Sequence, residues 1–165
     1  MSIRQLMVAV VICLSMFING VCFARISVSD LSIGGVYLNQ NFSDVISIYG
    51  KPVRESIPAG YGKIYSFSRG ESIFDIHVTR DNVVKGVTIC GNNGLALDSS
   101  GIRYGSSLND VIKYYGYPDQ TTSLYDNRLH VLTYRITNQS VTQELWIYIG
   151  INGTVTIISY DEFYG

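Results

Sequence analysis

The segment 42–52 reads FSDVISIYGKP, and the later segment 108–118 reads LNDVIKYYGYP. Asp, Val, Ile, Tyr, Gly and Pro occupy the same places in both segments, without a gap. A glycine followed by a β-branched residue precedes each segment at the same distance, at 35–36 and 101–102. Self-similarity at a fixed spacing is the signature of a repeated structural unit. We therefore expect a fold built from two copies of one unit.

Each repeated segment has the pattern of a short amphipathic helix. Apolar residues at 42, 45, 46 and 49, and again at 108, 111, 112 and 115, follow the i, i+3, i+4, i+7 spacing of one helix face. Asn41 and Ser107 stand directly before these segments, where a side-chain oxygen can accept a hydrogen bond from a free backbone N–H. A Gly-x-Pro sequence then follows and stops each helix. The sequence predicts helices over 42–49 and 108–115.

Strands follow each helix. Runs rich in Ile, Val, Thr and Tyr, separated by turn residues, predict strands at 63–68, 72–79 and 83–90 in the first unit, and at 129–137, 142–149 and 154–160 in the second. Residues 95–98 are a candidate edge strand, and residues 26–32 are a candidate short helix. We expect an α+β fold of two tandem repeats, 25–94 and 95–165. Each repeat is a short helix, or a helix pair, followed by a three- to four-stranded antiparallel meander, with the helices on one face of the sheet.

The segment 1–24 reads as a secretory signal peptide. Arg4 is basic, residues 6–18 are almost unbroken apolar, and small residues precede a cleavage point after Ala24. The apolar run is shorter than a membrane span requires, so no stable membrane insertion is expected after cleavage. Cys22 leaves open a lipoprotein alternative, although Val21 before it fits a lipidation motif poorly. We expect a secreted or periplasmic protein, most simply a soluble one.

The chain that remains after cleavage, 25–165, is long enough for one domain or for two small repeats that share a core. Of the 12 basic residues one is Arg4, which leaves 11 against 13 acidic residues and no basic stripe, so nucleic acid is a poor candidate partner. Two of the three cysteines lie in the signal peptide. Cys90 therefore stands alone, and no internal disulfide is expected.

The helix motif and the meander after it resemble the small module of the SmpA/OmlA (BamE) outer-membrane lipoproteins. Two such modules in tandem behind a signal peptide resemble the beta-lactamase inhibitor protein (BLIP) family. The resemblance covers nearly the whole chain after the signal peptide in architecture, and it rests on the helix and the Gly-x-Pro elements. It implies binding to another protein, with inhibition of a beta-lactamase as the most specific expectation. The chain departs from the inhibitor pattern because it lacks a disulfide in each repeat.

Alternation along the strands assigns side chains to the two faces of the sheet. Phe74, Ile76 and Val78 share one face, whereas Asp75 and His77 share the other. In 143–149, Leu145, Ile147 and Ile149 face the helices, and Glu144, Trp146 and Tyr148 face away. Arg135 on the neighbouring strand has the parity to lie beside them. We expect one exposed face across both units that binds a partner through Trp146, Tyr148, Arg135, Asp75 and His77. The alternative is that exposed aromatic residues only stabilise the sheet.

Residues for catalysis or metal binding are sparse. A cysteine nucleophile with a histidine base is conceivable for Cys90 and His77, but nothing in the sequence places them together, and Cys90 reads as a buried strand residue. The two histidines lie far apart, with no ligand cluster at metal-binding spacing. No glycine-rich phosphate loop opens a helix. We expect no catalytic residues, no cofactor and no metal.

The sequence favours an exported, non-catalytic module that binds an envelope or extracellular protein, including an enzyme that it would inhibit. An envelope assembly or structural factor of the SmpA/OmlA type is the alternative, and a small cysteine hydrolase is a third. The sequence leaves open the identity of the partner, the oligomeric state and whether the two sheets join.

Overall fold

The computed structural model describes residues 26–58, 62–70, 72–138 and 141–164, so the predicted signal peptide lies outside the described residues. The described chain has an α+β fold that is mostly sheet. Its helices are the 3-10 helix η1 (Val28–Asp30), α2 (Phe42–Tyr49) and α3 (Leu108–Tyr115). Its strands are β1 (Ser32–Ile33), β2 (Val36–Tyr37), β3 (Arg54–Ser56), β4 (Lys63–Arg69), β5 (Ser72–Val78), β6 (Val84–Cys90), β7 (Gln120–Leu124), β8 (Leu129–Asn138), β9 (Val141–Gly150) and β10 (Val155–Tyr164).

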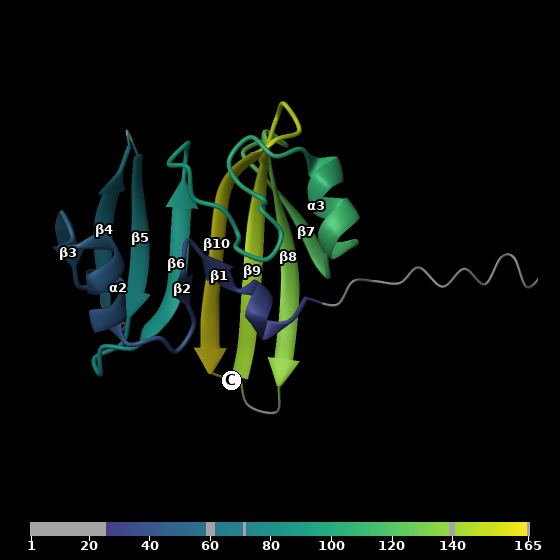
Figure 1. The fold of residues 1–165 in the computed structure, drawn as a ribbon. Coiled ribbons are helices and arrows are strands. Elements are labelled where there is room, and N and C mark those ends of the chain that lie inside the picture. The colour runs from purple at the N-terminus through teal and green to yellow at the C-terminus, as the bar shows by residue number, and fades with distance from the viewer. Residues whose placement is uncertain (1–25, 59–61, 71, 139–140, 165) are drawn as a thin grey trace, which may run out of the picture.

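Eight of these strands form one antiparallel sheet in the order β3-β4-β5-β6-β10-β9-β8-β7, and β1 pairs with β2 separately (Figure 1). The strands that follow α2 and those that follow α3 meet at β6 and β10. In this junction Thr88 faces Ser159, and their hydroxyl oxygens are 2.7 Å apart. The open question of whether two sheets join is thereby answered, because the sheet is continuous. The division of the chain into two repeats stays a prediction.

The two predicted helices are confirmed with the expected bounds. The Asn41 side chain accepts a hydrogen bond from the Ser43 backbone N–H at 2.9 Å, and Ser107 Oγ accepts one from the Asp110 N–H at 3.1 Å. Both helices end at a glycine with φ near 75°, a left-handed value that glycine adopts without strain. The candidate helix in 26–32 is the short η1.

The strand predictions are confirmed in type but incomplete. Each of the six predicted strands exists with small shifts at its ends, except that β10 runs on to Tyr164 rather than ending at residue 160. The prediction lacks the outer strands β3 and β7. The candidate edge strand at 95–98 is wrong, because Ala96 and Leu97 form only isolated bridges, to Arg103 and Ile33.

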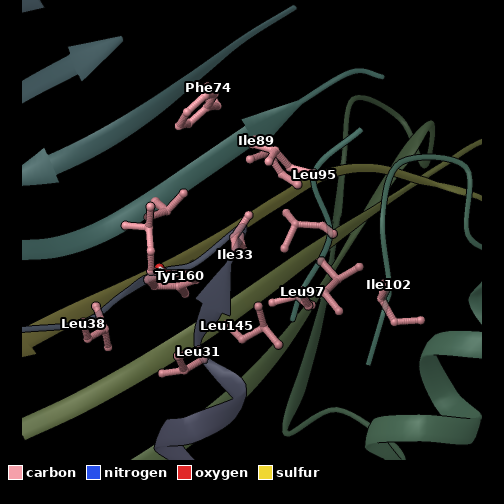
Figure 2. Packing of buried hydrophobic residues seen from close by; sticks show 14 of the residues in the cluster. Leu31, Ile33, Leu38, Phe74, Ile89, Leu95, Leu97, Ile102, Leu145 and Tyr160 are labelled. Atoms are coloured by element: carbon pink, nitrogen blue, oxygen red, sulfur yellow. The ribbon is translucent and has the colours of Figure 1, made fainter. Parts of the chain in front are cut away.

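Both helices lie on the same face of the sheet (Figure 1). Phe42 of α2 stacks on Tyr65 of β4 at 4.2 Å between ring centroids, and Tyr115 of α3 contacts Tyr134 of β8 at 5.5 Å. Between the helices, the segments around 31–38 and 95–102 fill the same face with buried leucine, isoleucine and valine side chains (Figure 2). One hydrophobic core therefore covers one face of the sheet and leaves the opposite face to solvent. Among the described residues, no helix is long and apolar enough to cross a membrane.

Candidate binding face

The sheet face opposite the helices, called the open face below, has the composition that alternation predicts. Phe74, Ile76 and Val78 are buried in the core, as are their counterparts on β9. Asp75 and His77 on β5, and Trp146 and Tyr148 on β9, are half-buried on the open face. The predicted assignment of these side chains to faces is confirmed. Whether this face binds a partner stays a prediction.

Strand register sorts the open face into rows that cross the whole sheet. The central row is Arg54, Ser66, Asp75, Thr88, Ser159, Trp146, Thr133 and Gln120, one residue from each strand. Asp75 and Trp146 therefore share a row but lie three strands apart, about 14 Å at the usual strand spacing. His77 and Arg135 share the next row. Arg135 therefore lies diagonally across from Trp146 on β8 and β9, and Tyr148 lies two residues further along β9. Asp75 and His77 lie apart from them on β5.

Trp146 is the centre of the aromatic part of the open face. Its ring packs edge-on against Phe163 of β10 with centroids 5.5 Å apart. The small side chains of its cross-strand neighbours Ser159 and Thr133 are buried beside the large indole ring. Among the described residues, no hydrogen-bond partner contacts the Trp146 indole N–H. Burial raises the pKa of the neighbouring Tyr148 hydroxyl. The patch combines apolar surface with donors that a partner can bind.

Arg135 is held in place beside this patch. Its Nε donates a hydrogen bond to Glu144 Oε1 at 2.6 Å, and its Nη2 donates one to Gln120 Oε1 at 2.8 Å. The hydrogen bond to Glu144 also raises the pKa of the guanidinium. The Arg135 side chain still keeps 40% of its surface exposed. An exposed group that is already ordered loses less entropy when a partner binds it.

His77 is tied to the other half of the sheet. Its Nδ1 lies 2.9 Å from Asp161 Oδ2, although β6 runs between β5 and β10. The residue of β6 directly between them is Gly86. A Cβ at position 86 would meet Asp161 Cγ at 2.8 Å and the Tyr160 carbonyl oxygen at 2.7 Å. Because Gly86 has no side chain, the His77 imidazole and the Asp161 carboxylate can meet above β6.

Cys90 corrects one expectation. The residue is exposed at the end of β6, not buried, because its parity matches that of Gly86 and points it to the open face. It lies four residues along β6 from Gly86, the partner of His77, so about 13 Å separates them along the strand. The thiol and the imidazole are on one face but far beyond hydrogen-bond reach. The geometry offers no support for a cysteine–histidine pair.

Sequence reasoning missed Asp161, Phe163 and Gly86. The first two escape it because the predicted last strand ends at residue 160, whereas β10 continues to Tyr164. Gly86 carries a weak signal, since a glycine inside a strand marks a close approach of other atoms. Among the described residues, no group of three or more His, Cys, Asp or Glu side chains is placed to hold a metal ion.

No protein-family model matches the chain, and no curated protein matches it. Solved structures share its fold. A DUF4309 family protein (YjgB) from Bacillus subtilis matches at 15% identity, over 78% of this chain and 82% of that one, with a TM-score of 0.51. A cysteine-rich secretory protein (SAV1118) from Staphylococcus aureus matches at 14% identity, over 79% of this chain and 46% of that one, with a TM-score of 0.53. An extracellular protein containing a SCP domain from Bacillus anthracis matches at 12% identity, over 75% of this chain and 43% of that one, with a TM-score of 0.52. The chain thus spans less than half of the last two proteins.

A protein from Streptococcus mutans named as a beta-lactamase inhibitor protein also matches, at 15% identity over 74% of this chain and 82% of that one. This match is consistent with the resemblance to the BLIP family, but its TM-score of 0.30 is too low to support an argument. The comparisons give no support to the resemblance to the SmpA/OmlA lipoproteins. Identities at this level show the α+β fold that the chain shares with these proteins, and they leave its activity undecided.

Proposed function

We propose that the chain is an exported, non-catalytic module that binds another protein through the open face, around Trp146, Tyr148, Arg135, Asp75 and His77. The observation that carries the proposal is the patch formed by Trp146 and Phe163 beside the ordered guanidinium of Arg135. Trp, Tyr and Arg are the residues that most often dominate the energy of protein interfaces. The partner is an envelope or extracellular protein, which includes an enzyme that the module would inhibit.

The proposal includes a scaffold of two tandem repeats, 25–94 and 95–165. Contacts between each helix segment and its last strand support it. Two backbone hydrogen bonds of the first half have counterparts in the second. The bond from Asn39 N to Val84 O corresponds to the bond from Gly105 N to Val155 O. The bond from Phe42 N to Asn82 O corresponds to the bond from Leu108 N to Gly153 O. In each pair of bonds, the two donor residues are separated by as many positions as the two helices, for example 42 and 108. The two acceptor residues are separated by more positions, for example 84 and 155. The hydroxyls of Tyr49 and Tyr115 also bind chain atoms 15 residues before them, in Gly34 and Ser100.

The longer spacing allows the open face of the two halves to be compared position by position. At this spacing Asp75 corresponds to Trp146 and His77 to Tyr148. The buried partners Phe74 and Ile76 correspond to Leu145 and Ile147, which are apolar in both halves. The core positions thus keep their character, whereas the open face changes from Asp and His to Trp and Tyr. We attribute this change to a partner that contacts the second half most closely.

The proposed export rests on the predicted signal peptide at 1–24. The secretory and extracellular descriptions of two proteins that share the fold agree with it. The non-catalytic role is supported by the separation of Cys90 from His77 along β6. Beta-lactamase inhibition is implied only by the family resemblance, and titration against a panel of beta-lactamases tests it.

Site-specific photo-crosslinking tests the proposal. A photoreactive phenylalanine analogue replaces Tyr148 on the open face or, as the control, the exposed Tyr37 on β2, which lies with the helices. Both variants are irradiated in cells that produce the protein naturally. The proposal expects a discrete protein adduct at position 148 that is missing at position 37. Adducts at 37 only, or at neither position, would overturn it.

A further inference from the structure

The two outer strands of the sheet differ in how well they are protected. β3 is three residues long, and two of these are the charged Arg54 and Glu55. Glu55 forms an ion pair with Lys63 of β4 at 2.7 Å, and Pro52 and Pro58 flank the strand. Short length, charge and proline are the features by which natural sheets prevent pairing with further strands. The β3 edge is therefore blocked.

β7 is less protected, although Pro118 and Asp119 stand directly before it. Its five residues, Gln120–Leu124, carry no charge and no proline. Among the described residues, the backbone of β7 forms hydrogen bonds only with β8. Tyr117 before the strand and Tyr125 after it are 67% and 77% exposed. The edge thus presents unpaired backbone donors and acceptors between two exposed aromatic side chains.

We propose that β7 pairs antiparallel with β7 of a second copy of this chain, about a twofold axis at Thr122. Such an interface uses the same strand on both sides. In this register Thr122 faces the partner's Thr122, and Gln120 faces the partner's Leu124. No like charges meet, and a threonine pair across antiparallel strands is favourable. A second copy fits this edge because an uncharged strand of this kind meets its own sequence without repulsion.

The molecule contains a junction of the same kind. β6 and β10 pair antiparallel, and their register is centred on Thr88 opposite Ser159, with hydroxyl oxygens 2.7 Å apart. Two small hydroxyl side chains therefore already form the centre of a strand pair in this sheet. Pairing at β7 would repeat that arrangement between two chains and extend the sheet beyond its outer strand. It would leave the aromatic patch around Trp146 uncovered, so this inference does not depend on the proposed function.

The expected dimer is weak. A pair of five-residue strands buries less than the roughly 1,200 Å² typical of stable complexes. We expect a dissociation constant between about 0.1 mM and about 1 mM, so the protein is a monomer when dilute.

Sedimentation velocity of the purified exported protein, from about 10 µM to about 1 mM, tests this inference. We expect the dimer fraction of the wild-type protein to rise over this range. Thr122→Lys places two ammonium groups opposite each other and should weaken the dimer about tenfold or more. Ser56→Lys adds the same charge to β3 and should change nothing. A wild-type protein that stays monomeric, or a dimer that Thr122→Lys leaves intact, would overturn the inference.

Amide hydrogen exchange of the wild-type protein gives a second readout that needs no variant. The backbone amides of β7 should exchange more slowly as the concentration rises, whereas those of β3 should not change. Equal behaviour of the two edges would contradict pairing at β7. Loss of the dimer in Trp146→Ala would also contradict it, because the open face would then be the interface.

Discussion

The imidazole of His77 and the carboxylate of Asp161 lie 2.9 Å apart above a strand that separates their own strands. His77 belongs to β5 and Asp161 to β10, so this contact joins the part of the sheet that follows α2 to the part that follows α3. Gly86 on β6 makes it geometrically feasible. The contact therefore couples the two parts of the open face at a place where no other side chain intervenes.

Gly86→Ala should destabilise the protein. The added methyl group would press on Asp161 Cγ at 2.8 Å and on the Tyr160 carbonyl oxygen at 2.7 Å. We expect a loss of about 1–3 kcal/mol in the free energy of unfolding, the usual cost of overpacking. Urea unfolding of the wild type and of the variant measures it.

Asp161→Ala provides the control for this substitution. In that background the methyl group meets only the backbone, so Gly86→Ala should cost less than it does in the wild type. An unchanged stability in the single variant would show that the glycine is not required.

Cys90 should react readily with a thiol reagent in the folded protein. The side chain is exposed at the end of β6, so labelling should be stoichiometric without denaturant. His77→Ala should leave the labelling rate unchanged, because about 13 Å of strand separates the two residues. A slower reaction in His77→Ala would mean that the imidazole activates the thiol, and the cysteine hydrolase alternative would return.

The helix caps should contribute about 1 kcal/mol each. Ser107→Ala removes the side-chain oxygen that accepts from the Asp110 N–H, and Asn41→Ala removes the equivalent contact to Ser43. Thermal or urea unfolding of both variants measures the loss. Unchanged stability in either variant would contradict the assigned cap.

The two caps should differ in their dependence on pH. Hydrogen bonds from the Ser107 side chain and backbone lower the pKa of the Asp110 carboxyl. A lowered pKa stabilises the fold above the ordinary Asp value of about 3.9, and that contribution is lost as the pH falls through the folded value. The stability difference between wild type and Ser107→Ala should therefore shrink in acid. The difference for Asn41→Ala, whose cap is an uncharged amide, should stay nearly constant.

The local elements could be predicted from the sequence because their signals are local. Asn41, Ser107 and the glycines at 50 and 116 define both helices within a few residues of chain. Alternation placed Trp146 and Asp75 on the correct face for the same reason. β3 and β7 escaped prediction because they are short, polar outer strands, held by pairing with β4 and β8 rather than by a hydrophobic pattern.

The long-range features of the open face could not be read from the sequence. The contact between His77 and Asp161 depends on the order of the strands, which brings residues 84 positions apart together over Gly86. The exposure of Cys90 depends on the same order, because an apolar strand predicts burial until its face is known. The register of β6 with its neighbours β5 and β10 supplies that information.

The affinity of Trp146→Ala for the partner captured by crosslinking tests the central claim most directly. Isothermal titration would compare wild type, Trp146→Ala and Tyr37→Ala, with circular dichroism to verify the fold of each. We predict that Trp146→Ala binds about 30-fold more weakly or worse, equivalent to about 2 kcal/mol at an interface hot spot, and that Tyr37→Ala binds like the wild type. A folded Trp146→Ala variant that binds with the wild-type affinity would contradict the claim.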